Sequence, residues 1–334
     1  MSKRKRLALI YGGEGEEHEV SLAGAAQVLP LIDTDKYSVL KVKIEQDGSV
    51  YRIGDSGRKT PLSLIRRGKR GGALIGDRFY PIAVALPLLH GRMGEDGAVQ
   101  GLLRTLGIPF VGCDTVAGAL CFDKRITKLV ARSLDIPTAD WVFCPNGSNP
   151  SAAIAEAEER IGYPLFVKPA RQGSSVGASI AYGPDELVRA MAQAMPYSHG
   201  GILIEEALTD KRELEVAYLS TPQARVITPP GEILCHGTYG YCEKYDRPVA
   251  TRTLAPLPPS VTELARKYTE ALALSLGVRG LSRFDYFYDG ERLLLNEVNT
   301  MPGFTSGSMY PAMIELAGID RRRLIDLLLE SPSC

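Results

Sequence analysis

Two polar-patterned strand segments near position 290 limit this chain to folds that carry a β-hairpin with oxygen-bearing side chains on one face. Arg283 and Asp285 stand two residues apart, as do Glu297 and Asn299, and alternate residues of a strand share a face. The intervening Tyr288–Gly290 predicts a three-residue hairpin loop that ends on a left-handed glycine. An odd loop length places five positions on the same side of the hairpin: 283, 285, 295, 297 and 299. A two-residue loop would instead place the two polar pairs on opposite faces.

Asp285, Glu297 and Asn299 offer the hard oxygen ligands that Mg²⁺ prefers, with Arg283 beside them. Such a set suits magnesium ions that bridge phosphate oxygens. The same pattern also describes a salt-bridged, half-solvated hairpin without any ligand. The hairpin alone leaves both interpretations open.

Length and composition narrow the class of protein. A chain of 334 residues is too long for one small core and suggests two or three α/β units. Because 39 Lys and Arg residues balance 39 Asp and Glu residues, we expect neither nucleic acid nor an anionic membrane as the main partner. The basic cluster at 3–6 precedes an apolar run at 7–11 that is too short for a signal peptide, and no apolar run approaches a membrane span. The six cysteines form no CxxC pair, which favours free thiols in a reducing cytoplasm over a cysteine-based metal site.

The N-terminal part has the pattern of a parallel α/β unit. An apolar strand at 7–11, a glycine loop and a helix at 20–31 open it. The elements expected next are a strand at 83–89, a helix at 98–106 and a strand at 108–112. This unit is expected to end near position 122.

Two further units are expected after it. The second contains helices at 124–134, 151–161 and 184–194 and strands at 165–168, 178–181 and 202–205. The third begins with a strand at 214–219 and carries the hairpin. The stretch from Pro229 to Pro259 is weakly patterned and rich in Pro, Gly and Tyr. A loop of that length inside a compact domain usually covers a site or is disordered.

Two motifs at strand ends suit a nucleotide. Lys168–Gly177 places a lysine and then small residues with free backbone N–H groups after a strand, as in a phosphate cover. It lacks the GxxxxGK[ST] order, which disfavours a Walker-type fold. The strand end at 204–208 could read adenine edges through its backbone, with Glu213 available to a ribose. Alone, the first motif is also typical of an ordinary tight turn, and the second is better explained as a solvated strand end.

Two N-terminal motifs suit a small ligand. The glycines of 90–97 would let the backbone approach a ligand closely, although a histidine such as His90 at a strand end is usually packed or solvated. The segment 12–19 lacks the GxGxxG order of a dinucleotide site. Its carboxylates could cap the following helix, or one of them could hold a substrate ammonium.

Taken together, these segments resemble one family, the D-alanine–D-alanine ligases, which are cytoplasmic ATP-grasp enzymes of peptidoglycan synthesis. The resemblance spans nearly the whole chain and is carried by GGEGEEHEVSL (12–22), HGRMGEDG (90–97), Asp123-Lys124, KPARQGSSVG (168–177), the 205–208 linker, EKY (243–245), RFD (283–285) and NEVNTMPGFTSGSMYP (296–311).

The resemblance implies an α/β fold with a three-domain ATP-grasp architecture and an N-terminal Rossmann-like (pre-ATP-grasp) domain. The domains would be 1–122 for substrate binding, 123–209 for the central ATP-grasp subdomain and 210–334 for the C-terminal subdomain with the metal site and a lid loop. It also implies two D-alanines as substrates, an acyl phosphate intermediate, ATP and two Mg²⁺ (or Mn²⁺) ions as cofactors, and a homodimer.

The implied nucleotide-site residues fall into three groups. Lys124 and Lys168 would contact ATP phosphates, and Ser174, Ser175 and Val176 would close over them. The 205–208 linker would hold adenine through the backbone of Glu206 and Leu208, beside Glu205 and Ala207. Glu213 would bind the ribose and Phe287 would floor the base. Asp285, Glu297 and Asn299 would hold the two metal ions.

The implied substrate residues complete the site. Glu17 would pair with the ammonium of the first D-alanine. Arg283 and the backbone of Gly303 would stabilise negative charge on the intermediates. Ser308 and Met309 would shape the second D-alanine pocket, and His90 and Lys244 would contact substrate. Tyr245, hydrogen-bonded with Ser174 and Glu17, would fix the loop 235–250 as a lid.

Alternatives remain for the second substrate and the reaction. Thr238–Tyr245 departs from the family's usual lid because Gly240 replaces an acidic residue and Glu243 precedes Lys244. Ligases that accept D-serine share the EKY lid, yet commonly carry a basic residue at the position of Met309, so D-alanine leads and D-serine is the alternative. An ATP-grasp ligase of another amino acid is a further alternative. A nucleotide-binding protein without chemistry is a non-enzymatic one, although Arg283 and the metal ligands are intact.

Overall fold

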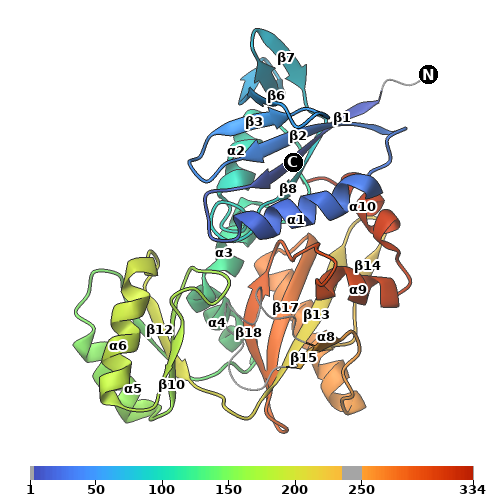
Figure 1. Cartoon of the computed structure of the whole chain (residues 1–334). Coiled ribbons are helices and arrows are strands. Elements are labelled where there is room, and N and C mark those ends of the chain that lie inside the picture. The colour runs from blue at the N-terminus through green and yellow to red at the C-terminus, as the bar shows by residue number, and fades with distance from the viewer. Residues whose placement is uncertain (1–3, 235–249, 334) are drawn as a thin grey trace.

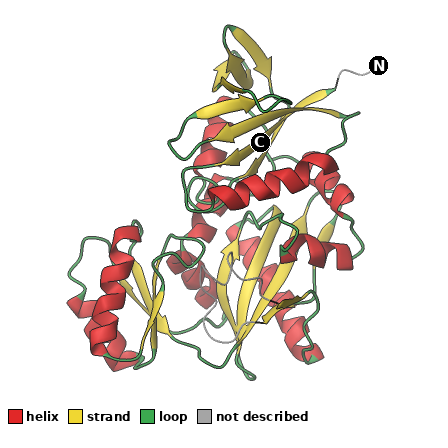
Figure 2. Cartoon of the chain, in the orientation of Figure 1, coloured by secondary structure: helices red, strands yellow, loops and turns green. Residues whose placement is uncertain are grey.

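The computed structural model describes residues 4–234 and 250–333, and within them four β-sheets form an α/β molecule (Figures 1 and 2). The expected α/β class is confirmed. The first sheet lies at the top of Figure 1, the central sheet at the lower left and the largest sheet at the lower right.

The first sheet has a parallel centre. Strand β1 (Lys5–Gly12) pairs in parallel with β2 (Tyr37–Ile44) and β8 (Val84–Leu88), and helix α1 (His18–Val28) connects β1 to β2 before a 3₁₀ turn η1 (Leu29–Leu31). Leu7 to Ile10 are all buried, as expected of a central parallel strand covered on both faces. Two antiparallel strands extend the sheet at one edge: β3 (Val50–Ile53) and β4 (Lys59–Pro61).

A small antiparallel sheet and two helices complete this region. The sheet contains β5 (Ser63–Arg67), β6 (Arg70–Ile75) and β7 (Arg78–Pro81), and the helices are α2 (Ala98–Leu106) and α3 (Thr115–Phe122). The expected strand at 108–112 is wrong. Phe110 alone forms isolated bridges, to Ala85 and Ser333, because Pro109 lacks an N–H donor and Gly112 is left-handed with φ 105°.

The central sheet is antiparallel, with the strand order β11-β10-β12-β9. It is formed by β9 (Trp141–Cys144), β10 (Leu165–Pro169), β11 (Ser179–Ala181) and β12 (Ile202–Glu206). Helices α5 (Ser151–Arg160) and α6 (Pro184–Ala194), the latter followed by the 3₁₀ turn η2 (Met195–Tyr197), lie together beside this sheet (Figure 1). Their alanine-rich inner faces pack with Leu165, Val167 and Ile204 into one buried cluster.

The largest sheet has six strands and carries the hairpin. Its strands are β13 (Arg212–Ser220), β14 (Arg225–Ile227), β15 (Gly231–Leu234), β16 (Ala250–Arg252), β17 (Gly280–Tyr288) and β18 (Leu293–Asn299). Helices α3, α4 (Lys124–Ser133) and α8 (Pro259–Leu276) share a buried cluster with one side of it. A second cluster contains residues of α9 (Met309–Leu316), α10 (Arg321–Leu329), α1 and the first sheet. One side of the largest sheet is therefore covered by helices, and part of its other side packs against α9, α10 and the N-terminal region.

The β17–β18 hairpin differs from expectation in its loop. Tyr288 pairs with Leu293 across a four-residue loop, 289–292, so the expected three-residue loop is wrong. An even loop by itself would turn Glu297 toward the core. The register instead shifts at Asn296, where a β-bulge lies between the pair Tyr286–Leu295 and the pair Asp285–Glu297. The bulge returns Glu297 to the face of Asp285.

The bulge also determines which face of the hairpin the other predicted residues occupy. Arg283 pairs with Asn299, so all four predicted polar residues lie on one face. The expectation that position 295 shares this face is wrong, because Leu295 pairs with Tyr286 and is 1% exposed.

The weakly patterned stretch 229–259 contains structure at both ends. Strands β15 and β16 lie within it and pair with each other. Residues 235–249, which include most of the expected lid, lie outside the described residues.

Candidate functional site

Two adjoining cavities lie between the sheets. One, of about 270 Å³, is lined by residues of β10, β12, β13 and β17. The other, of about 590 Å³, extends from the hairpin to α1 and to the segment that follows β18. They share a boundary formed by Lys124, Ser174, Glu215, Ile233, Arg283 and Glu297. A group bound in one cavity would therefore meet a group bound in the other at a wall of opposite charges.

The guanidinium of Arg283 is held between two carboxylates at this wall. It donates to both oxygens of Asp285 at 2.7 Å, and its Nε lies 3.2 Å from Glu215 Oε1. Glu215 pairs with Asp285 across β13 and β17 and is 4% exposed. Sequence reasoning missed Glu215, although its spacing of two from Glu213 on one strand placed it on the same face.

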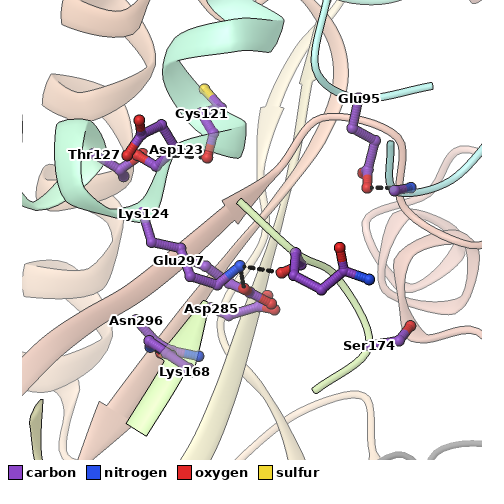
Figure 3. A network of polar contacts seen from close by, with 12 residues as sticks. Glu95, Cys121, Asp123, Lys124, Thr127, Lys168, Ser174, Asp285, Asn296 and Glu297 are labelled. Atoms are coloured by element: carbon purple, nitrogen blue, oxygen red, sulfur yellow. Dashed lines mark hydrogen bonds and ion pairs between the residues drawn. The ribbon is translucent and has the colours of Figure 1, made fainter. Parts of the chain in front are cut away.

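Lys124 reaches the hairpin from α4 (Figure 3). Its Nζ lies 3.0 Å from Glu297 Oε2 and donates to the carbonyl of Gln172 at 2.8 Å. Burial lowers the pKa of Lys124, but the carboxylates of Glu297, Glu95 and Glu205 together outweigh burial, and the net shift is upward. Asp123 caps α4 by accepting from Arg125 N and Ile126 N, which sets where the Lys124 side chain starts.

The arrangement of the three predicted metal ligands suits a divalent ion in part. Asp285 and Glu297 are opposite each other on one face. Among the residues that the structure describes, Asn299 Oδ1 is a buried oxygen with no hydrogen-bond partner, which suits a ligand to a cation. No cluster of three or more His, Cys, Asp or Glu side chains arranged for a metal occurs in the described ranges. A metal here would therefore rely on two carboxylates, one amide and oxygens from a bound phosphate.

Lys168 is fixed at the end of β10. Its Nζ lies 2.9 Å from Glu205 Oε2 and donates to Asn296 Oδ1 at 3.1 Å. Asn296 is the bulge residue, so the same irregularity that turns Glu297 also supplies this contact. Sequence reasoning missed Asn296 because nothing in the sequence marks the bulge.

Two aromatic residues, Phe287 and Phe166, line the first cavity. Phe287 pairs with Glu213 across β17 and β13, and Lys211 Nζ lies 3.8 Å from the centre of its ring and 2.8 Å from Glu213 Oε1. Phe166 lines the same cavity. Phe166 was missed, although its spacing of two from Lys168 on a strand was a usable signal.

The 205–208 linker lines this cavity. Backbone amides of Glu206 and Ala207 donate within the protein, to Asp140 O at 2.8 Å and Pro164 O at 3.1 Å. The Glu206 carboxylate lies 3.2 Å from Arg292 at the surface.

Glu17 lies at the edge of the second cavity, where Ser174 Oγ donates to Glu17 Oε1 at 2.5 Å. Two glycines border its carboxylate closely. A Cβ at Gly91 or Gly173 would approach Glu17 Oε2 to 2.4 or 2.8 Å. The glycines of the two motifs therefore let the backbone approach the Glu17 carboxylate closely, whereas the sequence predicted a close approach to a ligand. Ser174 and Ser175 have φ of 50° and 56°, and with Val176 they line the first cavity.

His90 and Glu95 connect the first region to the segment after β18. His90 Nδ1 lies 2.9 Å from Met301 O, and burial lowers the pKa of its ring. A neutral ring that donates from Nδ1 leaves Nε2 as its acceptor. Glu95 accepts from Gly91 N at 2.9 Å and Met301 N at 3.1 Å, and burial, then the charge of Glu17, raises its pKa to about 8.

The second cavity ends at the start of α9. Ser308 Oγ accepts from Thr305 N at 3.0 Å, and a Cβ at Gly303 would approach Ser308 Oγ to 2.7 Å. Met309 lines the cavity and is 5% exposed. Gly303, Ser308 and Met309 thus lie together at this cavity, whereas Lys244 and Tyr245 lie outside the described residues.

Models of protein families match two parts of the chain. Residues 6–113 match the D-ala D-ala ligase N-terminus and residues 130–330 the D-ala D-ala ligase C-terminus. A curated D-alanine–D-alanine ligase of Methylobacterium sp. (strain 4-46) is 37% identical over 358 residues, which cover 98% of this chain and 91% of that protein. In the described part of the chain, no helix is both long and apolar enough to span a membrane.

Solved structures agree over nearly the full length. The D-alanine–D-alanine ligase from Coxiella burnetii has a TM-score of 0.87 at 29% identity, covering 99% of this chain and 94% of that one. The VanG D-Ala:D-Ser ligase from Enterococcus faecalis has a TM-score of 0.89 at 31% identity, with coverage of 98% and 99%. These similarities confirm the expected ATP-grasp fold class. Since both family models match in order and a curated relative matches 98% of the chain, the chain belongs to the D-alanine–D-alanine ligase family.

Proposed function

We propose that this protein is an ATP-dependent ligase that joins two D-alanines into D-alanyl-D-alanine through a D-alanyl phosphate, for peptidoglycan precursor synthesis. The observation that carries the proposal is the shared wall of the two cavities, where Lys124, Arg283 and Glu297 border both. ATP in the first cavity would present its terminal phosphate at that wall. A carboxylate in the second cavity would meet it there.

The residues around the first cavity suit a nucleotide. Phe166 and Phe287 would stack on adenine, the Glu206 and Leu208 backbone would bind its edge, and Glu213 would bind the ribose. Lys124 and Lys168 would offset charge on the transferring phosphoryl group. Ser174, Ser175 and Val176 would cover it. Divalent ions held by Asp285, Glu297 and Asn299 would supply charge stabilisation at the phosphates.

The residues around the second cavity suit two small zwitterions. Glu17, fixed by Ser174, would bind the ammonium of the first D-alanine. Arg283 and the Gly303 backbone would stabilise the developing oxyanion. Ser308 and Met309 would bound the second D-alanine, and neutral His90 would offer Nε2 as an acceptor. Because Met309 is buried and apolar, the pocket favours D-alanine over D-serine.

The wider setting follows from the same proposal. The protein would act in the cytoplasm as a homodimer, with regions 1–122, 123–209 and 210–334 as its domains and Lys244 and Tyr245 in the lid. Its partners would be D-alanine and ATP, with no nucleic acid and no membrane.

The test is ADP release with MgATP, with mass detection of the product. We expect turnover with D-alanine alone and a dipeptide product, no turnover with L-alanine, and loss of turnover when divalent ions are chelated. A mixed product with D-alanine plus D-serine would assign D-serine to the second site. Absence of ADP release with D-alanine, in protein that binds ATP, would remove the proposed substrate.

A further inference from the structure

Behind the wall of the first cavity lies a buried lysine to which the proposed reaction gives no role. Lys128 follows Lys124 by one turn of α4. Its side chain is 1% exposed, and it lines neither cavity. A buried charge destabilises the fold unless it is paired. The groups that pair with Lys128 therefore indicate its role.

Lys128 is connected to the cavity through Glu205. Its Nζ lies 3.1 Å from Glu205 Oε1 as an ion pair off the line of a hydrogen bond, and it donates to Ala139 O at 3.5 Å. The other Glu205 oxygen, Oε2, lies 2.9 Å from Lys168 Nζ. The carboxylate therefore sits between two lysines, one behind the wall and one facing the cavity.

The charges of this cluster decide what Lys168 presents to a ligand. Two ammonium groups share one carboxylate, so the Lys128–Glu205–Lys168 cluster is positive overall. Lys168 also donates to Asn296, a neutral group that fixes its position without reducing its charge. Asp140, the other carboxylate that acts on Lys128, is exposed and is therefore screened by water. Without Lys128, Glu205 and Lys168 would form a neutral pair.

We propose that Lys128 is a positioning residue for the nucleotide, which shares the Glu205 carboxylate so that the charge of Lys168 stays available to the phosphates of ATP. This inference rests on the proposed ATP site. It assigns to Lys128 no contact with substrate and no part in the chemical step.

The test compares the binding of ATP and adenosine, by calorimetry, to the wild-type protein and to Lys128→Met. Methionine is close to lysine in length and leaves Glu205 paired with Lys168. We expect ATP to bind about tenfold more weakly and adenosine within about twofold of wild type, because a charge acts on the triphosphate far more than on a neutral nucleoside. Lys267→Met on α8, where the side chain is 65% exposed, is the matched control and should leave both affinities unchanged.

A double variant separates charge from packing. Lys128→Met with Glu205→Gln restores the overall positive charge of the cluster, and the ratio of ATP to adenosine affinity should return to within about threefold of wild type. A ratio further reduced in the double variant, or an unchanged ratio in Lys128→Met, would overturn the inference. Lys128→Gln, which also removes the charge, gives the same comparison should Lys128→Met prove insoluble. Wild-type protein that binds no ATP would instead contradict the proposed function.

Discussion

Lysine side chains near the cavities differ in how their charge is compensated. Lys124 is paired with one carboxylate, Glu297, whereas Lys128 and Lys168 share Glu205. Burial lowers the pKa of Lys128 to about 8, against the opposing effect of Glu205, while the pKa of Lys124 is raised. Of Lys124 and Lys128, Lys128 should therefore be the first to lose its proton as pH rises.

The pKa of Lys128 predicts a pH dependence of ATP binding. Between pH 7 and 9 Lys128 loses its proton, and the cluster with Glu205 and Lys168 goes from positive to neutral. We expect the wild-type dissociation constant for ATP to rise over this range by about the factor caused by Lys128→Met at pH 7, roughly tenfold. The Met variant should show a smaller rise, and measuring it corrects for titration of ATP itself. Equal pH profiles of the two proteins would exclude Lys128 as the titrating group.

Helix α4 illustrates how one element positions several site groups. Its cap, Asp123, accepts from two backbone amides with Oδ1 and from Arg171 Nε with Oδ2 at 2.8 Å. The cap thus fixes the start of the helix and also the first turn of the 168–177 loop. Lys124 and Lys128 follow on successive turns and reach Glu297 and Glu205.

Asp123→Ala should affect both stability and nucleotide binding. Loss of the cap is expected to cost about 1 kcal/mol of unfolding free energy, and a displaced Lys124 should raise the apparent KM for ATP. Asp320→Ala removes the cap of α10, where Asp320 accepts from Arg323 N. This control should lower the melting temperature without changing the KM for ATP. An unchanged KM in Asp123→Ala would show that α4 holds Lys124 without its cap.

Elements with continuous burial or clear helical pattern were predictable from the sequence. The helices at 98–106 and 184–194 begin and end where expected, and the strand at 7–11 lies inside β1. Strands β2 to β7 were missed because most of their residues are half-exposed or exposed and because all but β2 are short, so the hydrophobic pattern is weak there. The run 108–112 shows the converse, since Ile108 and Phe110 are buried without forming a strand.

Site residues were predictable from the sequence where they stand in a motif, and not where only the fold brings them to the site. Glu17, Lys124 and Arg283 stand in motifs, and all three border the second cavity. Asn296 and Lys128 acquire their roles from a β-bulge and from a contact with a distant segment. No spacing in the sequence reveals either of them, whereas Glu95 stands in the 90–97 motif and Glu215 stands two residues from Glu213.

At the scale of the whole molecule, buried hydrogen bonds join the first region to the segment after β18. Glu95 accepts from Gly91 N and Met301 N, and His90 Nδ1 contacts Met301 O. Glu17 and Gly303 both line the cavity that His90 and Glu95 border. These hydrogen bonds add to the buried cluster of α1, α9 and α10 in holding the proposed substrate site together. An ion pair between Lys36 and Glu330 also joins the two parts, at the surface.

Glu95→Ala should therefore weaken both the fold and substrate binding. It leaves two buried amides without acceptors, at a cost of roughly 1–3 kcal/mol each, and it frees Met301 near Gly303. We expect a lower melting temperature and a raised KM for D-alanine. Lys36→Ala removes the exposed ion pair and should change neither quantity measurably. A Glu95→Ala enzyme with a wild-type KM for D-alanine would mean that the substrate site is positioned by other contacts.

The bulge at Asn296 makes the distance in sequence between Asp285 and Glu297 a poor guide to their geometry. An even loop with one extra strand residue and an odd loop with a regular ladder bring the same two carboxylates to the same face. Relatives could therefore exchange one solution for the other through paired insertions and deletions without losing the site. A search that demands fixed spacing would overlook such chains, whereas one that scores the phase of each half-strand separately would find them.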